Sequence, residues 1–294
     1  MTSLTGRQRR ATPCFLLMAA FAGCASDPQA RWQGPFFYIQ MADPQFGMFA
    51  ADKDVEKEAA LLDQAIQHAN RLRPAFVVIC GDLINRPGDP GQIEEFLRVA
   101  GRLDRAIPLH LVSGNHDVEN TPTPESLNRY RQRFGPDWYA FNQGGCRFVV
   151  INTTLIHDPS KAPEEMQRQE TWLKQELTDP QGPRPVHTIV FQHHPWFNQS
   201  PDEPDAYENI PRARRSQYLD WLTQAEVSAV FAGHCHGNSM ARYGNMEIVA
   251  TGPVGKPLRK DPSGLRIVEV YKDRIVHQYY PLEAVPARVC LAER

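Results

Sequence analysis

Short runs of apolar residues alternate with longer amphipathic stretches along most of the chain. Five of the apolar runs are too short for helices and are rich in branched and aromatic side chains, which is typical of strands in a buried sheet. These runs are residues 36–41, 76–80, 109–113, 188–192 and 227–232. Four longer stretches carry apolar residues at intervals of three and four, a spacing that predicts helices. They cover residues 52–71, 93–105, 164–177 and 212–225. Strands that alternate with helices predict an α/β fold.

Two further pairs of short runs predict β-hairpins, because turn residues separate them. Residues 138–141 and 147–152 flank a Gln-Gly-Gly triplet, and residues 265–271 and 274–280 flank a Lys-Asp pair. Antiparallel strands are therefore expected beside the parallel ones. Neither an internal repeat nor a low-complexity linker interrupts the pattern, so residues 25–294 are expected to form a single domain.

The first 24 residues have the features of an export signal. Arginines at positions 7, 9 and 10 precede an apolar run over 14–22, which is too short for a permanent transmembrane helix of about 20 residues. Ala20-Phe21-Ala22 would suit an ordinary signal peptidase, whereas Phe21-Ala22-Gly23-Cys24 resembles a bacterial lipobox, and we favour the lipobox. We therefore expect export to the bacterial periplasm or a membrane-anchored lipoprotein, with Cys24 as the lipid anchor. A buried N-terminal helix is the alternative, but Pro13 fits it poorly.

Composition and charge exclude several classes of protein. The chain has 294 residues, of which 41% are hydrophobic and 22% charged, as is ordinary for a globular protein. Its 32 basic and 34 acidic residues give a net charge of −2, so no nucleic-acid partner is expected. Two of the six cysteines belong to the export segment, and the other four lack a regular spacing and predict no disulfide framework, although a bridge between Cys80 and Cys235 is the alternative to two free thiols. Cys80 and Cys235 are expected to be buried as small apolar residues.

Each of the five predicted strands runs directly into polar residues. Listed in chain order, these are Asp43-Pro44-Gln45, Gly81-Asp82, Gly114-Asn115-His116-Asp117, His193 and Gly233-His234-Cys235-His236. Ligands of α/β sheets gather at the carboxyl ends of the strands. Carboxylate, amide and imidazole groups that meet there would form a pocket rich in metal ligands.

This ordered series resembles the calcineurin-like metallophosphoesterases, whose pattern runs D-x-H, G-D, G-N-H-[DE], H and G-H-x-H. The resemblance covers nearly the whole chain after the export signal of the first 24 residues. It implies a four-layer α/β/β/α sandwich, in which two mixed β-sheets pack face to face between helices. It also implies a dinuclear metal centre at the strand ends and a phosphorylated substrate.

The resemblance also implies which side chains would bind two divalent metal ions. Asp43 and His236 would bind one ion, Asn115, His193 and His234 would bind the other, and Asp82 would bridge the two. Carboxylates neutralise cationic charge and imidazoles add directional nitrogen ligands, while an amide oxygen binds without a further negative charge. His194 is not expected to be a ligand, because the family motif aligns with His193.

The chain departs from the family pattern at two positions. Gln45 stands where the wider family has the histidine of D-x-H, and its oxygen could coordinate a metal weakly or hydrogen-bond to a metal-bound water. A neutral amide is a poorer ligand than imidazole for zinc or iron, so manganese or magnesium would fit better. Asn85 stands where purple acid phosphatases carry their tyrosine ligand, so a coloured tyrosinate-iron centre is not expected.

The expected activity is metal-dependent hydrolysis of phosphomonoesters, including phosphoserine or phosphothreonine. A hydroxide held between the metals would attack phosphorus in line. His116 would protonate or stabilise the leaving oxygen, and Asp117 would orient the imidazole and raise its basicity. A phosphodiesterase acting on cyclic nucleotides or other diesters is the alternative enzyme, and a noncatalytic metal-binding scaffold is the alternative of another class.

Two weaker features are candidates for the substrate site. The irregular, acid-rich stretch over 196–211 contains Tyr207 and could form a lid or a solvated loop. The arginines at 212, 214 and 215 could clamp a phosphate, but a charged first turn of an exposed helix is the favoured interpretation.

Overall fold

The computed structural model describes residues 31–178 and 184–291 and contains two β-sheets. The expected export signal over 1–24 lies outside the described residues. The five-stranded sheet has the order β11-β10-β1-β2-β3, and the six-stranded sheet has the order β4-β5-β6-β7-β9-β8. The first sheet contains β1 (Phe36–Met41), β2 (Val77–Cys80), β3 (Leu109–Val112), β10 (Gly264–Val270) and β11 (Ile275–Pro281). The second contains β4 (Tyr139–Gln143), β5 (Cys146–Val150), β6 (Thr188–Phe191), β7 (Val227–Ala232), β8 (Ser239–Tyr243) and β9 (Met246–Ala250).

Both sheets are mixed. Strands β1, β2 and β3 pair in parallel, while β10 and β11 add antiparallel strands at one edge. In the second sheet β5, β6, β7 and β9 are parallel, and β4 and β8 pair antiparallel at the two edges. The expected hairpins therefore exist as β4–β5 and β10–β11.

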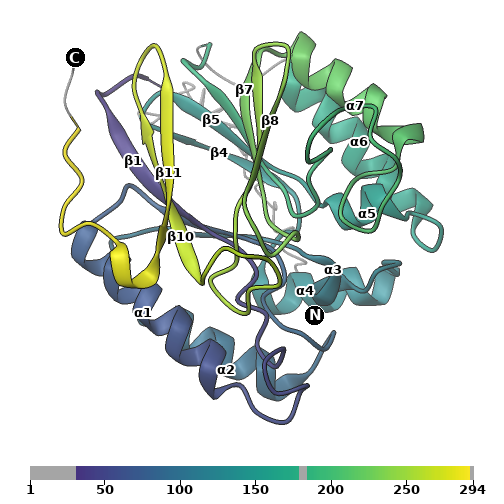
Figure 1. The fold of residues 1–294 in the computed structure, drawn as a ribbon. Helices are drawn as coiled ribbons and strands as arrows, with labels where there is room; N and C mark the ends of the chain where they lie inside the picture. The colour runs from purple at the N-terminus through teal and green to yellow at the C-terminus, as the bar shows by residue number, and fades with distance from the viewer. Residues whose placement is uncertain (1–30, 179–183, 292–294) are drawn as a thin grey trace, which may run out of the picture.

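Helices cover the outer faces of the sheets (Figure 1). The helices are α1 (Glu56–Leu72), α2 (Pro90–Ala100), α3 (Asn115–Val118), α4 (Pro124–Phe134), α5 (Thr153–His157), α6 (Pro163–Thr178) and α7 (Arg212–Gln224), with a short 3-10 helix at Leu282–Ala284. Helices α1 and α2 lie against the first sheet, and α6 and α7 against the second. The expected four-layer α/β/β/α architecture is confirmed. Within the described residues, no helix is long and apolar enough to cross a membrane.

The inner faces of the two sheets meet in an aromatic core. Tyr38 of β1 packs edge-on against Phe148, Phe191 and Phe231 of the second sheet, with ring centroids 5.7, 5.5 and 6.1 Å away. The core has a second cluster of buried apolar residues besides the aromatic one. The next residue along β1, Ile39, belongs to this second cluster, together with Leu62 of α1. Because both faces of the sheet are covered, the sequences of its central strands are continuous apolar runs. Cys80, Cys146 and Cys235 are buried free thiols, as expected for Cys80 and Cys235.

The elements differ from the expected ones mainly at their ends. Helix α1 begins at Glu56 and not at 52, since Ala51 and Asp52 have positive φ angles that a helix cannot continue. Helix α2 begins three residues early, at Pro90, because the Asp89 side chain accepts a hydrogen bond from Gln92 N and caps it.

Candidate metal centre

The polar residues that follow the strands meet at one end of the two sheets. Asp43 and Gln45 follow β1, Asp82 follows β2, Asn115 to Asp117 follow β3, His193 follows β6, and His234 and His236 follow β7. Main-chain hydrogen bonds join these loops, for example Asp43 N to Gly81 O at 3.1 Å and Gly233 N to His193 O at 3.0 Å. Each of the predicted metal ligands is buried. Loops from both sheets thus build one compact site.

The backbone of this site is strained. The residues with positive φ include five of the predicted ligands, namely Asp43 (50°), Gln45 (41°), Asp82 (49°), His234 (68°) and His236 (47°). Side chains other than glycine rarely adopt this region, and such conformations persist where the surrounding structure enforces them, often at functional sites. The motif glycines allow close packing, since a Cβ at Gly114 would collide with the Asp82 carboxylate.

Main-chain carbonyls set the orientation of the four histidines that were predicted to act in the site. Each histidine hydrogen-bonds a carbonyl oxygen through one ring nitrogen. The pairs are His116 Nδ1 with Asn85 O (2.6 Å), His193 Nδ1 with Cys80 O (2.9 Å), His234 Nε2 with Tyr207 O (2.9 Å) and His236 Nδ1 with Lys256 O (2.6 Å). A carbonyl only accepts, so the bonded nitrogen carries the proton. The other nitrogen of each ring is left with a lone pair for a metal or a proton.

Four atoms with lone pairs converge where the second metal ion was expected. The Nε2 atom of His193 lies 3.0 Å from Asn115 Oδ1, 3.3 Å from Asp82 Oδ1 and 3.1 Å from His234 Nδ1. Ligands at 2.0–2.2 Å from an octahedral ion are about 3 Å apart. The spacing therefore fits a divalent cation among these residues.

The pKa values reflect this need for positive charge. Burial lowers the pKa of His193, but the Asp82 and Asp43 carboxylates outweigh burial and raise it to about 9. Burial and the neighbouring His193 lower the pKa of His234 to about 3. A proton on His193 thus balances the carboxylates when no cation is bound, and a metal ion would take the place of that proton.

Asp43, Gln45 and His236 surround the expected position of the first metal ion. Asp43 Oδ1 lies 3.9 Å from His236 Nε2, and ligand atoms of Asp43, Asp82 and His193 lie within 4.8 Å of one another. The Gln45 amide nitrogen donates to Asn85 Oδ1 at 3.1 Å, while its Oε1 is buried and has no partner among the described residues. An unpartnered buried oxygen on the residue two positions after Asp43 fits a role as a metal ligand.

The structure corrects the expected role of Asp117. Its Oδ1 accepts hydrogen bonds from Leu83 N (2.9 Å) and Ile84 N (3.3 Å), and its Oδ2 accepts one from Gly114 N (2.8 Å). Asp117 therefore fixes the loops after β2 and β3, because both of its oxygens are committed to backbone N–H groups. The Asn85 carbonyl, and not Asp117, orients the His116 imidazole.

His194 is also near the cluster, although it was not expected to bind metal. One of its ring nitrogens lies within 4.8 Å of ligand atoms of His193 and His234. Its Nδ1 lies 3.4 Å from Thr153 Oγ1, and its ring stacks on His157 with centroids 5.0 Å apart. The contacts to Asp82 and Asn115 come from His193.

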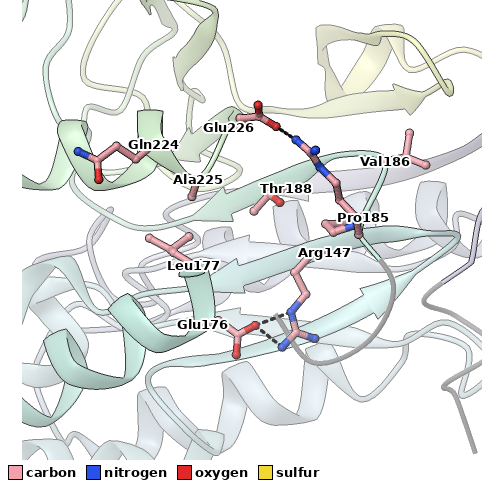
Figure 2. A pocket seen from close by; sticks show the side chains of 10 residues that line it. Arg147, Glu176, Leu177, Pro185, Val186, Thr188, Gln224, Ala225 and Glu226 are labelled. Atoms are coloured by element: carbon pink, nitrogen blue, oxygen red, sulfur yellow. Dashed lines mark hydrogen bonds and ion pairs between the residues drawn. The ribbon is translucent and has the colours of Figure 1, made fainter. Parts of the chain in front are cut away.

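A separate cavity of about 430 Å³ lies at the other end of the second sheet (Figure 2). Arg147 and Thr188, at the start of β5 and β6, help to line it, and Arg147 pairs with Glu176. None of the predicted site residues lines this cavity. It is therefore distinct from the metal centre.

Comparisons with known proteins agree with this geometry. The family model described as calcineurin-like phosphoesterase matches residues 38–238. The chain is 41% identical over 282 residues to the human serine/threonine-protein phosphatase CPPED1, covering 90% of this chain and 89% of the relative. It is 36% identical to the Danio rerio protein of the same name, covering 92% of each. A solved dimetal phosphatase from Danio rerio shares the fold with a TM-score of 0.60 at 19% identity, covering 84% of this chain and 96% of that one. The chain belongs to the calcineurin-like phosphoesterase family and is a metallophosphoesterase that hydrolyses phosphoesters.

Proposed function

We propose that this protein hydrolyses phosphomonoesters with two divalent metal ions held by Asp43, Gln45, Asp82, Asn115, His193, His234 and His236. The observation that carries the proposal is the convergence of Asn115 Oδ1, Asp82 Oδ1 and His234 Nδ1 within 3.3 Å of His193 Nε2. When bound, divalent ions would acidify water and neutralise charge on the phosphate oxygens. Manganese or magnesium suits the amide oxygens of Gln45 and Asn115 better than zinc or iron.

His116 is the proposed proton donor. Its backbone N–H donates to Asp82 Oδ1 at 2.9 Å, and its Nδ1–H donates to the Asn85 carbonyl at 2.6 Å. These two bonds fix the ring beside the metal centre, and among residues 31–178 and 184–291 no hydrogen-bond partner occupies its Nε2. With Nδ1–H held by the carbonyl, a proton carried on Nε2 would pass to the leaving oxygen as the P–O bond breaks. Asp117 supports this arrangement by holding the two loops.

The substrate class rests on the similarity to proteins named serine/threonine-protein phosphatases. Phosphoserine and phosphothreonine side chains are accordingly the proposed substrates. No nucleic-acid substrate is proposed, because the net charge of −2 offers no general attraction for a polyanion.

The test is hydrolysis of paired p-nitrophenyl phosphate monoester and diester substrates by metal-stripped protein. The protein is refilled singly with manganese, magnesium, iron or zinc, and Asp82→Ala and His116→Ala are measured beside the wild type. His187→Ala is a matched control, because His187 lies at the opposite end of β6 and bonds Ser228 and the Tyr271 carbonyl.

We expect metal to restore monoester turnover, both site variants to lose at least about 100-fold in kcat, and His187→Ala to match the wild type. Preference for the diester would instead favour a phosphodiesterase. Absence of turnover with every metal, in folded protein that still binds metal, would favour a noncatalytic scaffold.

We also propose that the chain is exported and anchored through a lipid on Cys24. The support is the three early arginines, the short apolar run and the Phe21-Ala22-Gly23-Cys24 sequence, together with a domain whose first strand, β1, begins downstream at Phe36. Expression with radioactive palmitate should label the wild-type protein and not Cys24→Ser. Release of both proteins at the same processed size without label would favour ordinary signal peptidase cleavage.

A further inference from the structure

The segment between β6 and α7, residues 195–211, is held in place by a buried arginine. Arg215 is only 1% exposed. Its Nε donates to Ile210 O at 3.0 Å, and its Nη1 donates to Pro201 O at 2.8 Å and to Glu203 O at 2.9 Å. The segment has no helix or strand of its own, so these bonds satisfy carbonyls that secondary structure would otherwise pair. We had expected Arg215 to belong to an exposed charged turn. It is instead a buried side chain that clamps this segment.

A second set of contacts fixes the tip of the same segment. Glu203 accepts from the backbone N–H groups of Asn198 and Gln199, both at 2.9 Å. The Asn209 amide donates to Glu203 Oε1 at 2.7 Å, and its oxygen accepts from Ala206 N at 3.1 Å. The acidic side chain thus holds the loop together, and residues 206–209 have a defined position.

Tyr207, at this tip, contacts two proposed ligands of the second metal ion. Its carbonyl accepts from His234 Nε2 at 2.9 Å, and its hydroxyl lies 2.8 Å from Asn115 Nδ2. The Tyr207 and His234 rings lie 4.8 Å apart, centroid to centroid. One residue of an irregular loop therefore reaches both an imidazole and an amide of the same site.

These contacts control which atoms face the metal. The Asn115 amide nitrogen donates to the Tyr207 hydroxyl and to Asn120 Oδ1, the latter at 2.9 Å. With both amide hydrogens engaged on that side, Asn115 Oδ1 is directed toward His193 Nε2, 3.0 Å away. The Tyr207 carbonyl fixes the proton of His234 on Nε2 and leaves Nδ1 as the ligand. Groups that bond metal ligands in this way commonly change metal affinity by 10- to 100-fold.

We propose that Tyr207 is a positioning residue for the second metal site, acting through Asn115 and His234. This inference rests on the proposed two-metal function and assigns a role to the 195–211 segment within it. The Tyr207 side chain is 54% exposed, so it contributes little to the core, and its loss should affect metal binding more than folding.

The test is a titration of metal-free protein with Mn²⁺, followed by electron paramagnetic resonance. Tyr207→Phe removes the hydroxyl and keeps the ring and the backbone carbonyl. We expect one Mn²⁺ to bind as in the wild type and the other to bind at least about tenfold more weakly, with the same melting temperature in the absence of metal. Tyr280→Phe is the matched control, because its exposed hydroxyl bonds Gln278 on β11.

Asp82→Ala separates the possible failures. If Asp82→Ala loses Mn²⁺ while Tyr207→Phe binds both ions as tightly as the wild type, the role of Tyr207 is wrong and the two-metal site stands. If Asp82→Ala also binds both ions normally, the proposed metal site itself is wrong. Equal weakening by Tyr207→Phe and Tyr280→Phe would also overturn the proposal.

Discussion

Two adjacent histidines follow strand β6, and their surroundings differ. His193 Nε2 lies 3.3 Å from Asp82 Oδ1, whereas His194 stacks on His157 inside the protein. We expect His193→Ala to lose one bound metal ion and at least about 100-fold in kcat. His194→Ala should keep both ions and lose about 0.5–3 kcal/mol of stability, because it leaves a cavity. Metal content by mass spectrometry and urea unfolding measure these effects. Loss of metal from His194→Ala alone would reverse the assignment.

The side chains of the centre could be predicted from the sequence, and their partners could not. Asp82 and His234 each follow an apolar strand and a glycine, so their residue type and position predict that they are metal ligands. No sequence pattern predicts the roles of the Asn85 and Tyr207 carbonyls, because every residue has a carbonyl and its direction depends on the loop conformation. The same reason explains the error about Asp117. An acidic residue beside a histidine suggests a contact, but the helical turn of α3 directs the carboxylate to backbone N–H groups.

Among the elements, helix α4 and strands β8 and β9 were not predicted from the sequence. Helix α4 has few apolar residues, and its start depends on the Thr123 side chain, which accepts from Ser126 N. Strand β8 alternates half-buried and exposed residues at a sheet edge, with Met240 66% exposed, so it lacks an apolar run. Burial on both faces of the sheet produces the apolar runs of β6 and β7, whereas β8, which is half-buried or exposed throughout, shows no such run.

The clamp on the 195–211 segment gives a prediction for one element acting on another. Arg215→Met removes three hydrogen bonds to main-chain carbonyls, one of them buried, and we expect a loss of about 2–4 kcal/mol in the free energy of unfolding. Because Tyr207 would no longer be held at the metal centre, the second Mn²⁺ should also bind more weakly. Arg212→Met is the matched control on the same helical turn, since Arg212 is exposed, and should change stability by less than about 0.5 kcal/mol. Equal effects of the two variants would contradict the clamp.

At the scale of the whole molecule, the site requires the two sheets to stay together. Asp43, Asp82 and Asn115 come from the sheet that contains β1, and His193 and His234 come from the other. Aromatic contacts close the seam between the sheets at β3 and β4, where the His110 ring stacks on Phe141 with centroids 3.6 Å apart. Separation of the sheets at this seam would therefore be coupled to loss of the metal centre.

His110 makes this seam sensitive to acid. Burial lowers its pKa from the ordinary 6.5 to about 4, so between these values the unfolded chain binds more protons than the folded one. The stability from the neutral ring is therefore fully present above pH 6.5 and is lost as pH falls through about 4, by up to about 3 kcal/mol. His110→Phe keeps an aromatic ring and removes the titration. Urea unfolding at pH 7.5 and 4.5 should show a smaller loss of stability in the variant than in the wild type, because other buried histidines still titrate in both proteins. Equal losses would mean that the ring is not held neutral at the seam.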